Sequence, residues 1–443
     1  MKRILIKDTV NEAGKSVKVC GWVNVVRAHG KILFIDLRDI SGVLQVVFTP
    51  DKAEVYELAK KLRGEWVIEI VGKINKRPEK MVNSKIETGK VEMQAEDIKI
   101  LSEAETSPIP INDEGVEESD IDKRMDWRWL DLRRPEKTLV FKIWTTMEAA
   151  FRDYWVSNEY IEIHSPKLIG APSESGSEVF EVKYFDKKAF LAQSPQFYKQ
   201  MAMAAGFEKV FEVGPVFRAE PSFTSRHSTE FTGYDAEISF VESHEDVMEE
   251  EEKLLKYVLE KIKEKHGEEI KKYFNVEVTI PKLPFPKLTM KEAKKILASL
   301  KVPSEKKGDL SPEEERKICE YIKEKEGHEF LFITDYPIEV RPFYHMRRED
   351  DPTLTKSFDL LWKGLEITTG AQREHRYDVL VKQAKEKKMK LNSIQFYLDF
   401  FKYGCPPHGG MGIGPNRMIM MLLGINNIRD ASFIYRGVKR LTP

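Results

Sequence analysis

Two arginines and a histidine lie close together in the middle of the sequence, between two segments that alternate like β-strands. Arg218 directly follows the first segment, residues 209–217. Arg226 and His227 come after a short polar loop, just before the second segment, residues 230–240. Because guanidinium groups pair bidentately with phosphate oxygens, this arrangement could hold a polyphosphate from several sides. An antiparallel hairpin with a solvated charged turn would show the same pattern.

The second segment adds an aromatic ring and two carboxylates. Side chains alternate between the two faces of a strand, so Phe231, Asp235 and Glu237 share one face. Tyr234 and Ile238 share the other face. One face is therefore aromatic and acidic, whereas the other face is expected to pack in the core.

A glycine-rich turn is expected near the C-terminus, from Gly409 to Gly414, before Arg417 and an apolar helix. Small residues allow a ligand to approach the backbone, and the N-terminus of a helix favours anions. A tight structural turn needs the same residues, so this feature alone is weak. Combined with the arginine-bearing strand pair, the glycine-rich turn becomes a strong indication of a ligand-binding site.

These segments together resemble the class II aminoacyl-tRNA synthetases. The resemblance is carried by motif 1 in IEIHSPKLIG (161–170, with Pro166), motif 2 in VFRAE and RHSTEF (216–220 and 226–231), and motif 3 in GIGPNR (412–417). Within that class, QSPQFYKQ (193–200), GAQREHR (370–376) and the ending LTP are similar to the aspartyl-tRNA synthetases of the compact archaeal and eukaryotic type. The resemblance covers nearly all of the chain.

The resemblance implies ATP-dependent attachment of L-aspartate to tRNA(Asp) through an aspartyl-adenylate. The ATP-binding residues that it implies are Arg218, Glu220, Arg226, His227, Phe231, Glu366 and Arg417. Arg218 and Arg417 are expected to be catalytic, with Arg218 stabilising the α-phosphate during the attack. Phe231 is expected to stack on the adenine, with Glu220 near the amino group of the base.

Two carboxylates are expected to approach one another across a hairpin. Lys363 and Gly364 would form the turn between two apolar strands, which brings Asp359 toward Glu366. Like charges at close range need a cation between them, and Mg²⁺ carrying ATP phosphates takes one or two carboxylates. The resemblance assigns metal contacts to both positions, with Thr369 as a further oxygen ligand. An ordinary hairpin whose carboxylates pair with neighbouring lysines is the alternative.

Lys199 and Arg373 are the residues expected to select the amino acid. Each lies in one of the aspartyl-type motifs, and the resemblance assigns both to the side-chain carboxylate of aspartate. Leaving one buried charge unpaired costs about 2–5 kcal/mol, so such a site prefers aspartate over neutral asparagine. The other amino-acid contacts that the resemblance implies are Glu174, Ser194, Gln196, Asp235, Thr369 and His408. For His408, a purely structural role is the alternative.

The elements that must position these residues form two regions and a linker. Residues 1–103 contain five segments that alternate like short strands, which is typical of an OB-fold β-barrel. Residues 104–135 are proline-bearing and charged, as expected of a hinge or linker. Residues 136–443 are expected to form an α+β catalytic domain, an antiparallel sheet flanked by helices, with a helical insertion at about 245–330. Within the insertion, the charged run 249–272 is expected to be a solvated helix face.

Three residues of the expected barrel are candidates for anticodon recognition. OB-fold faces bind single-stranded nucleic acid by stacking bases on exposed aromatic rings, at about 1–3 kcal/mol per base. The resemblance implies that Phe34 stacks on an anticodon base and Gln45 reads a base edge, with Arg27 nearby. A Phe34 that only fills the barrel is the alternative.

Composition places few limits on function. Charged residues make up 33% of the 443 residues and nearly cancel, to a net charge of −1, so any nucleic-acid surface must be local. The three cysteines are far apart and show no metal-ligand spacing. No apolar run approaches the ~18 residues that span a bilayer, so no membrane partner and a cytoplasmic location are expected. Family analogy adds a homodimer formed through the motif 1 region.

Three other functions share much of this sequence pattern. A non-discriminating enzyme would also charge tRNA(Asn), and the difference would lie in the barrel around residues 24–31 and 75–85. An amide-forming ligase that makes asparagine through the same adenylate would be expected to lack the barrel. A non-catalytic RNA-binding paralogue would be expected to lose the catalytic and metal-binding residues named above, which are all present.

Overall fold

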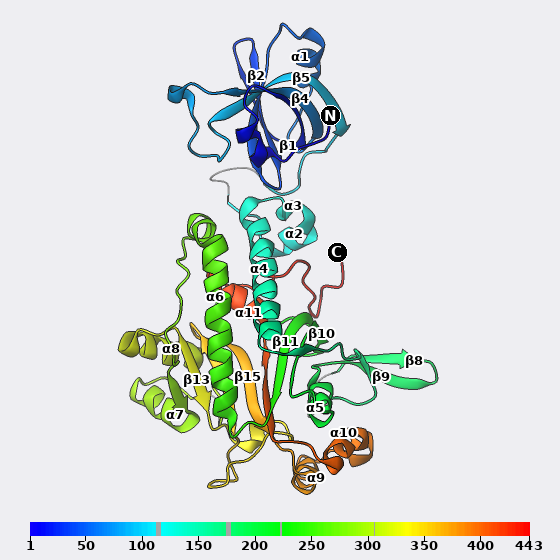
Figure 1. Cartoon of the computed structure of the whole chain (residues 1–443), viewed down its shortest axis with the longest axis vertical. Coiled ribbons are helices and arrows are strands. Elements are labelled where there is room, and N and C mark those ends of the chain that lie inside the picture. Colours follow the sequence, from blue (N-terminus) through cyan, green and yellow to red (C-terminus); the bar gives the residue numbers. More distant parts are fainter. Residues whose placement is uncertain (112–116, 174–178, 222–223, 305) are drawn as a thin grey trace. The chain divides into compact units, whose positions relative to one another are not determined.

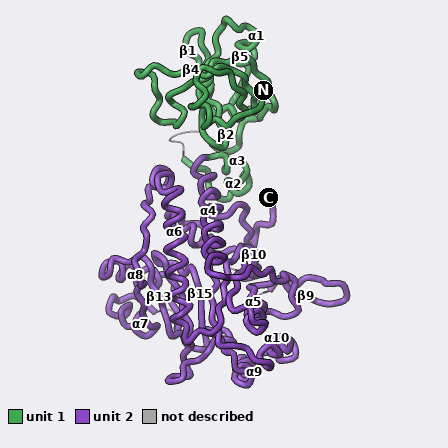
Figure 2. Tube along the Cα trace, viewed as in Figure 1, with its two compact units in different colours: residues 1–134 green, residues 135–443 purple. Residues whose placement is uncertain are grey.

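The chain divides into two compact units, Met1–Arg134 and Pro135–Pro443, which Figure 2 shows in different colours. The computed structural model describes every residue apart from 112–116, 174–178, 222–223 and 305. Most of the segment expected as a linker belongs to the first unit. Glu174, one of the expected amino-acid contacts, lies outside the described residues.

The first unit is built on a closed five-stranded barrel with the strand order β1-β2-β3-β5-β4. Its strands are β1 (Ser16–His29), β2 (Ile32–Asp39), β3 (Gly42–Phe48), β4 (Val67–Lys76) and β5 (Val91–Ser102). On β2, Leu33, Ile35 and Leu37 are buried inside the barrel, whereas Phe34 and Asp36 between them are only half-buried. This alternation fills the barrel from one face of each strand and confirms the expected OB-type fold.

Short helices complete the first unit. They are η1 (Ile6–Asn11), α1 (Ala53–Ala59), η2 (Glu79–Met81), α2 (Ile121–Asp126) and α3 (Arg128–Asp131). Glu65, just before β4, accepts from Arg38 of the barrel at 3.0 Å and from Arg133 beyond α3 at 2.8 Å. The segment that follows the barrel is therefore tied back to it by a shared carboxylate.

The second unit is built on an eight-stranded sheet with the order β12-β13-β14-β15-β16-β11-β10-β6 (Figure 1). These strands are β12 (Lys287–Thr289), β13 (Phe330–Thr334), β14 (Ser357–Trp362), β15 (Leu365–Arg373), β16 (His408–Ile413), β11 (Glu230–Ser239), β10 (Lys209–Phe217) and β6 (Ile161–Glu162). The six central strands pair antiparallel, as expected, and the edge strands β12 and β6 pair parallel. A separate small sheet contains β7 (Leu168–Ile169), β9 (Lys187–Leu191) and β8 (Glu181–Tyr184).

Helices flank this sheet. They are α4 (Pro135–Ser157), α5 (Gln196–Ala204), α6 (His244–Phe274), α7 (Met290–Ser299), α8 (Pro312–Glu326), α9 (Tyr377–Glu386), α10 (Gln395–Asp399) and α11 (Pro415–Leu423), with short turns η3 (Ile338–Val340), η4 (Leu391–Ser393) and η5 (Phe400–Tyr403). The two long helices, α4 and α6, lie side by side, and α6 also packs on β15 and β16 (Figure 1). Among the described residues, no helix combines the length and apolar character needed to cross a bilayer.

Helix α6 differs from the expectation of a solvated, charge-laced helix. One face carries Val247, Leu254 and Val258, all buried, because the helix packs on α4 and on the sheet. The carboxyl group of Glu251 is also fully buried on that face. The expectation of a solvated run was wrong for this face, since the many charged residues hid an apolar stripe with helical spacing.

Candidate active site

A cavity of about 270 Å³ is lined by residues of β10, β11, β15 and β16 and the segments that follow β10 and β16, by the start of α5, and by the segment after η3. Most of the residues expected to bind ATP or the amino acid line it: Ser194, Gln196, Lys199, Arg218, Glu220, Arg226, His227, Phe231, Asp235, Glu366, Thr369, Arg373 and Arg417. Side chains up to 223 positions apart in the sequence, from Ser194 to Arg417, therefore share one space. Neither Asp359 nor His408 is among its lining residues.

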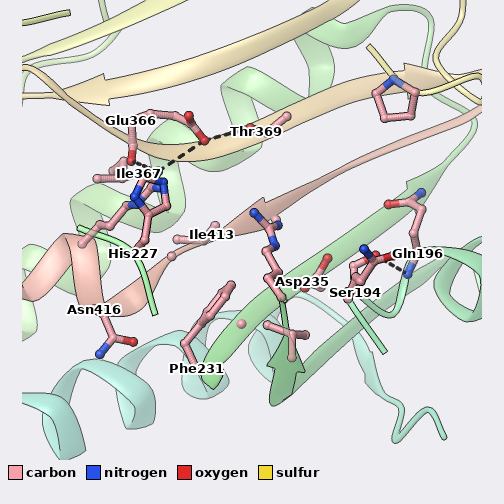
Figure 3. Close-up of a pocket in the computed structure, with 18 of the residues that line it drawn as sticks. Ser194, Gln196, His227, Phe231, Asp235, Glu366, Ile367, Thr369, Ile413 and Asn416 are labelled. Atoms are coloured by element: carbon pink, nitrogen blue, oxygen red, sulfur yellow. Dashed lines mark hydrogen bonds and ion pairs between the residues drawn. The ribbon is translucent and has the colours of Figure 1, made fainter. Parts of the chain in front are cut away.

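The cavity has two chemically different ends (Figure 3). Glu366, Thr369 and His227 lie at one end, and Arg417 reaches the same place because its Nη1 donates to the carbonyl of Glu366 at 2.9 Å. We call this the arginine-rich end. Ser194, Gln196 and Asp235 lie toward the opposite end, with the Phe231 ring in between. We call this second region the lysine end, because Lys199 is bound there to Asp235.

The lysine end is a buried network of opposite charges. Lys199 Nζ donates to Asp235 Oδ1 at 2.9 Å and lies 3.2 Å from Glu237 Oε2. Arg373 Nε donates to the other oxygen of Glu237, also at 2.9 Å. The side chains of Lys199 and Arg373 are only 2% and 3% exposed, so neither is a surface charge. Two cations and two carboxylates therefore balance one another at this end.

Glu237 holds the two cations together, and the sequence interpretation assigned it no role in the site. Burial alone would raise the pKa of its carboxyl group, but Arg373 and Lys199 hold that pKa below its ordinary value. Its signal was present in the sequence, since the period of two places it on the same face of β11 as Phe231 and Asp235. The carboxylate therefore stays ionised and orients both cations.

His345 is a second functional candidate that the sequence interpretation missed. Its Nε2 lies 3.0 Å from Arg373 Nη1, and a guanidinium can only donate, so Nε2 is the acceptor. Burial, and then the charge of Arg373, lower the pKa of His345 well below its ordinary value. The neutral ring therefore fixes Arg373 from the side opposite Glu237. His345 comes from an irregular segment, where no periodicity could have pointed to it.

The glycine-rich segment before Arg417 is a strand rather than the expected turn. Residues 408–413 form β16, which pairs with both β11 and β15. A Cβ at Gly410 would lie 2.0 Å from Glu237 Oε2, and a Cβ at Gly412 would lie 3.3 Å from Asp235 Oδ1. The small residues therefore make room for the carboxylates of the neighbouring strand, which the sequence could not reveal without the strand order.

At the arginine-rich end, arginine side chains and the His227 ring lie around one carboxylate, that of Glu366. The Arg218 guanidinium lies 5.5 Å from the centre of the Phe231 ring. Burial, and then the nearby Arg417, lower the pKa of His227 below its ordinary value, so its ring is neutral near pH 7. Arg417 follows Gly414 and Pro415 at the start of α11, where the backbone N–H groups favour anions. This end suits a ligand with several negative oxygens.

The expected hairpin between Asp359 and Glu366 is present, and the cation beside Asp359 is an arginine side chain. Lys363 and Gly364 have φ angles of 51° and 86°, as a two-residue turn of type I′ requires. Asp359 lies opposite Thr369 in the register rather than opposite Glu366, and Thr369 Oγ1 donates to Glu366 Oε1 at 3.1 Å.

Arg341, which the sequence interpretation missed, lies 2.7 Å from Asp359. Its guanidinium also stacks 3.6 Å from the centre of the Tyr336 ring. Burial raises the pKa of Asp359, Arg341 opposes that rise, and the charge of Glu366 adds to it. A buried Asp359 therefore depends on a cation, and one is supplied by the protein itself.

The donor set fits a magnesium ion that arrives with phosphates. Asp359 Oδ1 is buried and has no hydrogen-bond partner in the described part of the chain. Asp359 and Glu366 line a common hollow next to the main cavity. No group of three or more acidic, histidine or cysteine side chains with metal-binding geometry occurs in the described ranges. Two carboxylates and a hydroxyl are too few for a cage made only of protein, but they suffice for Mg²⁺ that keeps phosphate and water ligands.

His408 lies behind the cavity rather than in it. It is fully buried, and the side-chain amide of Gln200 donates to its Nε2 at 2.9 Å. Its Nδ1 donates to the carbonyl of Pro406 at 2.8 Å, and burial lowers the pKa of the ring to about 4. With both nitrogens engaged, the ring is neutral and has no donor for a ligand. This geometry favours the structural alternative over contact with the amino acid.

In the barrel, the three candidate anticodon residues lie on one face of neighbouring strands. Arg27 pairs with Phe34 across β1 and β2, and it forms a bidentate ion pair with Asp36 at 2.6 and 2.7 Å. Gln45 lies opposite Asp36 in β3 and accepts from Arg77 at 2.6 Å. Phe34 is half-buried on the outer face, so it does not merely fill the barrel.

Two family models match the chain. The model described as OB-fold nucleic acid binding domain matches residues 17–101, and the model described as tRNA synthetases class II (D, K and N) matches residues 120–434. The second match alone covers well over half of the chain. The chain therefore belongs to the class II tRNA synthetases of the D, K and N group, enzymes that use ATP as a substrate.

Individual relatives place the chain beside the aspartyl enzymes of that group. It is 43% identical over 432 residues to an aspartate–tRNA(Asp) ligase of Pyrococcus abyssi, covering 97% of both chains. It is 42% identical over 443 residues to an aspartate–tRNA(Asp/Asn) ligase of Aeropyrum pernix, covering 99% of this chain and 98% of the relative. The crystal structure of asparaginyl-tRNA synthetase from Pyrococcus horikoshii with asparaginyl-adenylate matches all of both chains with a TM-score of 0.92 and 31% identity.

Proposed function

We propose that this chain attaches L-aspartate to tRNA(Asp) in two ATP-dependent steps, with aspartyl-adenylate as the bound intermediate. The observation that carries the proposal is the buried pair Lys199 and Arg373 in the same cavity as Arg218 and Phe231. When the α-amino group of the bound amino acid pairs with Asp235, Lys199 needs another partner, which the side-chain carboxylate of aspartate supplies and neutral asparagine does not. The relatives named as aspartate–tRNA ligases support the same assignment.

In the first step, the α-carboxylate of aspartate attacks the α-phosphorus of ATP in line. The bond between the α-phosphorus and the bridging oxygen breaks, pyrophosphate leaves, and aspartyl-adenylate remains. The nucleophile is already ionised, so no general base is needed, and catalysis rests on positioning and charge neutralisation. Arg218 neutralises the α-phosphate, Phe231 stacks on the adenine, and Glu220 lies near the amino group of the base.

The remaining phosphates occupy the arginine-rich end, where Arg226, His227 and Arg417 face the cavity. Mg²⁺ bound with ATP would be held by Glu366, Asp359 and Thr369 and would neutralise charge on the phosphate oxygens. Asp235, Ser194 and Gln196 bind the amino and backbone groups of aspartate at the lysine end, and Glu174 is proposed as a further contact of the amino acid.

In the second step, a hydroxyl of the terminal ribose of tRNA attacks the carbonyl carbon of the adenylate, and AMP leaves. The barrel contributes by holding the anticodon, with Phe34 stacking on a base and Gln45 and Arg27 beside it. By analogy with the family, we also infer a homodimer formed through residues 161–170 and a cytoplasmic location.

Charging of tRNA(Asn) as well is a second candidate function, because the similar Aeropyrum pernix enzyme is named for both tRNAs. Arg77 belongs to the segment 75–85 and donates to Gln45, so one of the two barrel regions that could set the choice contacts the residue proposed to read a base edge. Charging assays on purified tRNA(Asp) and tRNA(Asn) decide between the two candidates. Aspartylation of tRNA(Asp) alone supports a discriminating enzyme, and equal aspartylation of both supports a non-discriminating one.

The first step is tested by ATP–pyrophosphate exchange with each amino acid in turn. We expect exchange with aspartate and at least roughly 30-fold weaker kcat/KM with asparagine, as follows from about 2 kcal/mol for an unpaired buried charge. Arg218→Ala should lower exchange roughly 100- to 1,000-fold, the usual effect of removing one donor from a developing charge. Exchange that favours asparagine, or that survives in the Arg218→Ala variant, would contradict the proposal.

A further inference from the structure

The segment 245–330 contributes to the arginine-rich end, although its sequence pattern gave no chemistry. A hollow of about 140 Å³ adjoins the main cavity there. One wall comes from residues with proposed roles in binding phosphate and metal: Arg226, His227, Asp359, Glu366 and Arg417. The other wall includes Lys306, Asp309 and Leu310 from the loop before α8, and Glu315 from α8 itself.

Glu315 makes a direct ion pair with Arg226. Arg226 Nη1 donates to Glu315 Oε2 at 3.0 Å, and the two side chains are only 21% and 11% exposed. Within the described part of the chain, Nη1 is the only guanidinium nitrogen of Arg226 with a hydrogen-bond partner. Its Nε and Nη2 therefore remain available for a ligand, since a guanidinium carries five N–H donors in a fixed fork.

The two partners differ in how firmly the backbone holds them. Glu315 lies in the first turn of α8, which is fixed by a capping box between Ser311 and Glu314 and by Pro312 at its start. Arg226 lies in the loop between β10 and β11, outside any helix or strand. A long arginine side chain on a loop loses much rotamer freedom when it binds phosphate. A rigid partner that already holds one edge of the guanidinium would reduce that loss.

The electrostatic setting of Glu315 supports the same interpretation. Burial raises the pKa of its carboxyl group to about 7, while Arg226 opposes the rise and Glu366 adds to it. A carboxylate here is therefore unfavourable by itself, and it opposes bound phosphates. Its ion pair with Arg226 points to a role in orienting the guanidinium rather than in binding the ligand directly.

We propose that Glu315 is a positioning residue that fixes Arg226, so that the free edge of the guanidinium meets the terminal phosphates of ATP. The inference rests on the proposed function, because it takes Arg226 as a phosphate ligand. It assigns to α8 a part in ATP binding. Glu315 itself touches neither ATP nor aspartate in this account.

The test measures two quantities for the full-length protein by pyrophosphate exchange, the KM for ATP and the KM for aspartate. Glu315→Ala should raise the KM for ATP about 10-fold or more, as expected when a hydrogen bond to a charged group is lost. The KM for aspartate should stay unchanged. Glu315→Gln should recover most of the loss, because the amide oxygen can still accept from Arg226. Glu320→Ala serves as the matched control, since this residue lies on α8 and is exposed.

A double-mutant cycle separates positioning from a general structural effect. In an Arg226→Ala background, Glu315→Ala should cause little further rise in the KM for ATP. An undiminished effect there, or an unchanged KM for ATP in the single variant, would overturn the inference. If Glu315→Ala unfolds, Glu315→Lys, which cannot accept from Arg226, takes its place in the cycle, and an unchanged KM for ATP in that variant would overturn the inference.

If the proposed function itself is wrong, the result is different, because the wild-type protein then supports no pyrophosphate exchange with aspartate. Direct calorimetric titration with Mg²⁺ and ATP would then still measure the effect of Glu315→Ala on nucleotide binding. Weaker binding in that variant would support the inference, and unchanged binding would overturn it.

Discussion

At the scale of single residues, the charges of the lysine end are paired with one another in the structure. Glu237 bonds both Lys199 and Arg373, and His345 fixes Arg373 from another side. Preformed donors lower the reorganisation needed when a carboxylate binds. The same balance makes each member hard to replace, because removal of one charge leaves its partner buried and unpaired.

Replacement of Lys199 tests this pairing. Lys199→Met should lower kcat/KM for aspartate by roughly 30-fold or more, since about 2–5 kcal/mol is lost when a buried charge has no partner. Pyrophosphate exchange at varied aspartate concentrations measures the change, and thermal unfolding checks the fold. Lys188→Met is the control, because Lys188 is a surface lysine with a 74% exposed side chain. An aspartate kcat/KM equal to that of the control would remove Lys199 from the site.

The sequence predicted those site residues that lie on regular strands or in strong motifs. Phe231 and Asp235 follow the period of two on β11, and the Lys363–Gly364 turn followed from its flanking strands. Arg341 and His345 could not be predicted, because they lie in an irregular segment that only the tertiary fold brings to the cavity. These two residues were missed because they are far from the other site residues in the sequence and lie in a segment without periodicity. Their chemistry is not unusual.

At the scale of elements, helix α6 shows how a charged sequence can hide a buried surface. The five strands of the barrel were predicted, since each alternates clearly. The buried face of α6 was not predicted, because Glu251 and Glu252 interrupt its apolar stripe. Neither oxygen of Glu251 has a hydrogen-bond partner in the ranges that the structure describes. A buried carboxyl group of this kind should be neutral.

Glu251 makes a pH dependence of stability testable. Burial, and then the charges of Glu252 and Asp359, raise its pKa from 4.5 to about 8 in the folded chain. Between pH 4.5 and 8 the unfolded chain has lost this proton and the folded chain keeps it, so the contribution of Glu251 to stability falls as pH rises. The fall is about 1.4 kcal/mol per pH unit at most and ends above the folded pKa.

Glu251→Gln removes this titration while keeping the shape of the side chain. We expect the variant to gain stability relative to the wild type as pH rises from 5 to about 8. Urea unfolding midpoints at several pH values measure the difference. Glu249→Gln, an exposed position on the same helix, should show no such trend. A constant gap between Glu251→Gln and the wild type across this range would mean that Glu251 is ionised in the folded chain.

At the scale of the whole molecule, the two units divide the reaction between them. The proposed chemistry of adenylate formation uses only residues of the second unit. The proposed anticodon contacts Arg27, Phe34 and Gln45 all belong to the first unit. Variants in the barrel should therefore affect transfer to tRNA without affecting the activation of aspartate.

Phe34→Ala tests this division. Loss of one stacked base, at about 1–3 kcal/mol, should lower kcat/KM for tRNA by roughly 5- to 150-fold. Pyrophosphate exchange with aspartate, which needs no tRNA, should be unchanged. Ile40→Ala is the control, because Ile40 is an exposed apolar residue in the turn just after β2. Equal loss in both assays would show that Phe34 supports the fold rather than the anticodon.

The central claim is that one cavity joins ATP to aspartate and delivers the product to tRNA(Asp). Its most direct test is a charging assay with purified protein, ATP, Mg²⁺, aspartate and a tRNA(Asp) transcript, in which aspartyl-tRNA, AMP and pyrophosphate are all quantified. We expect equal amounts of the three products and no aspartyl-tRNA when ATP is left out. Hydrolysis of ATP to ADP, or AMP formation without aspartyl-tRNA, would contradict it.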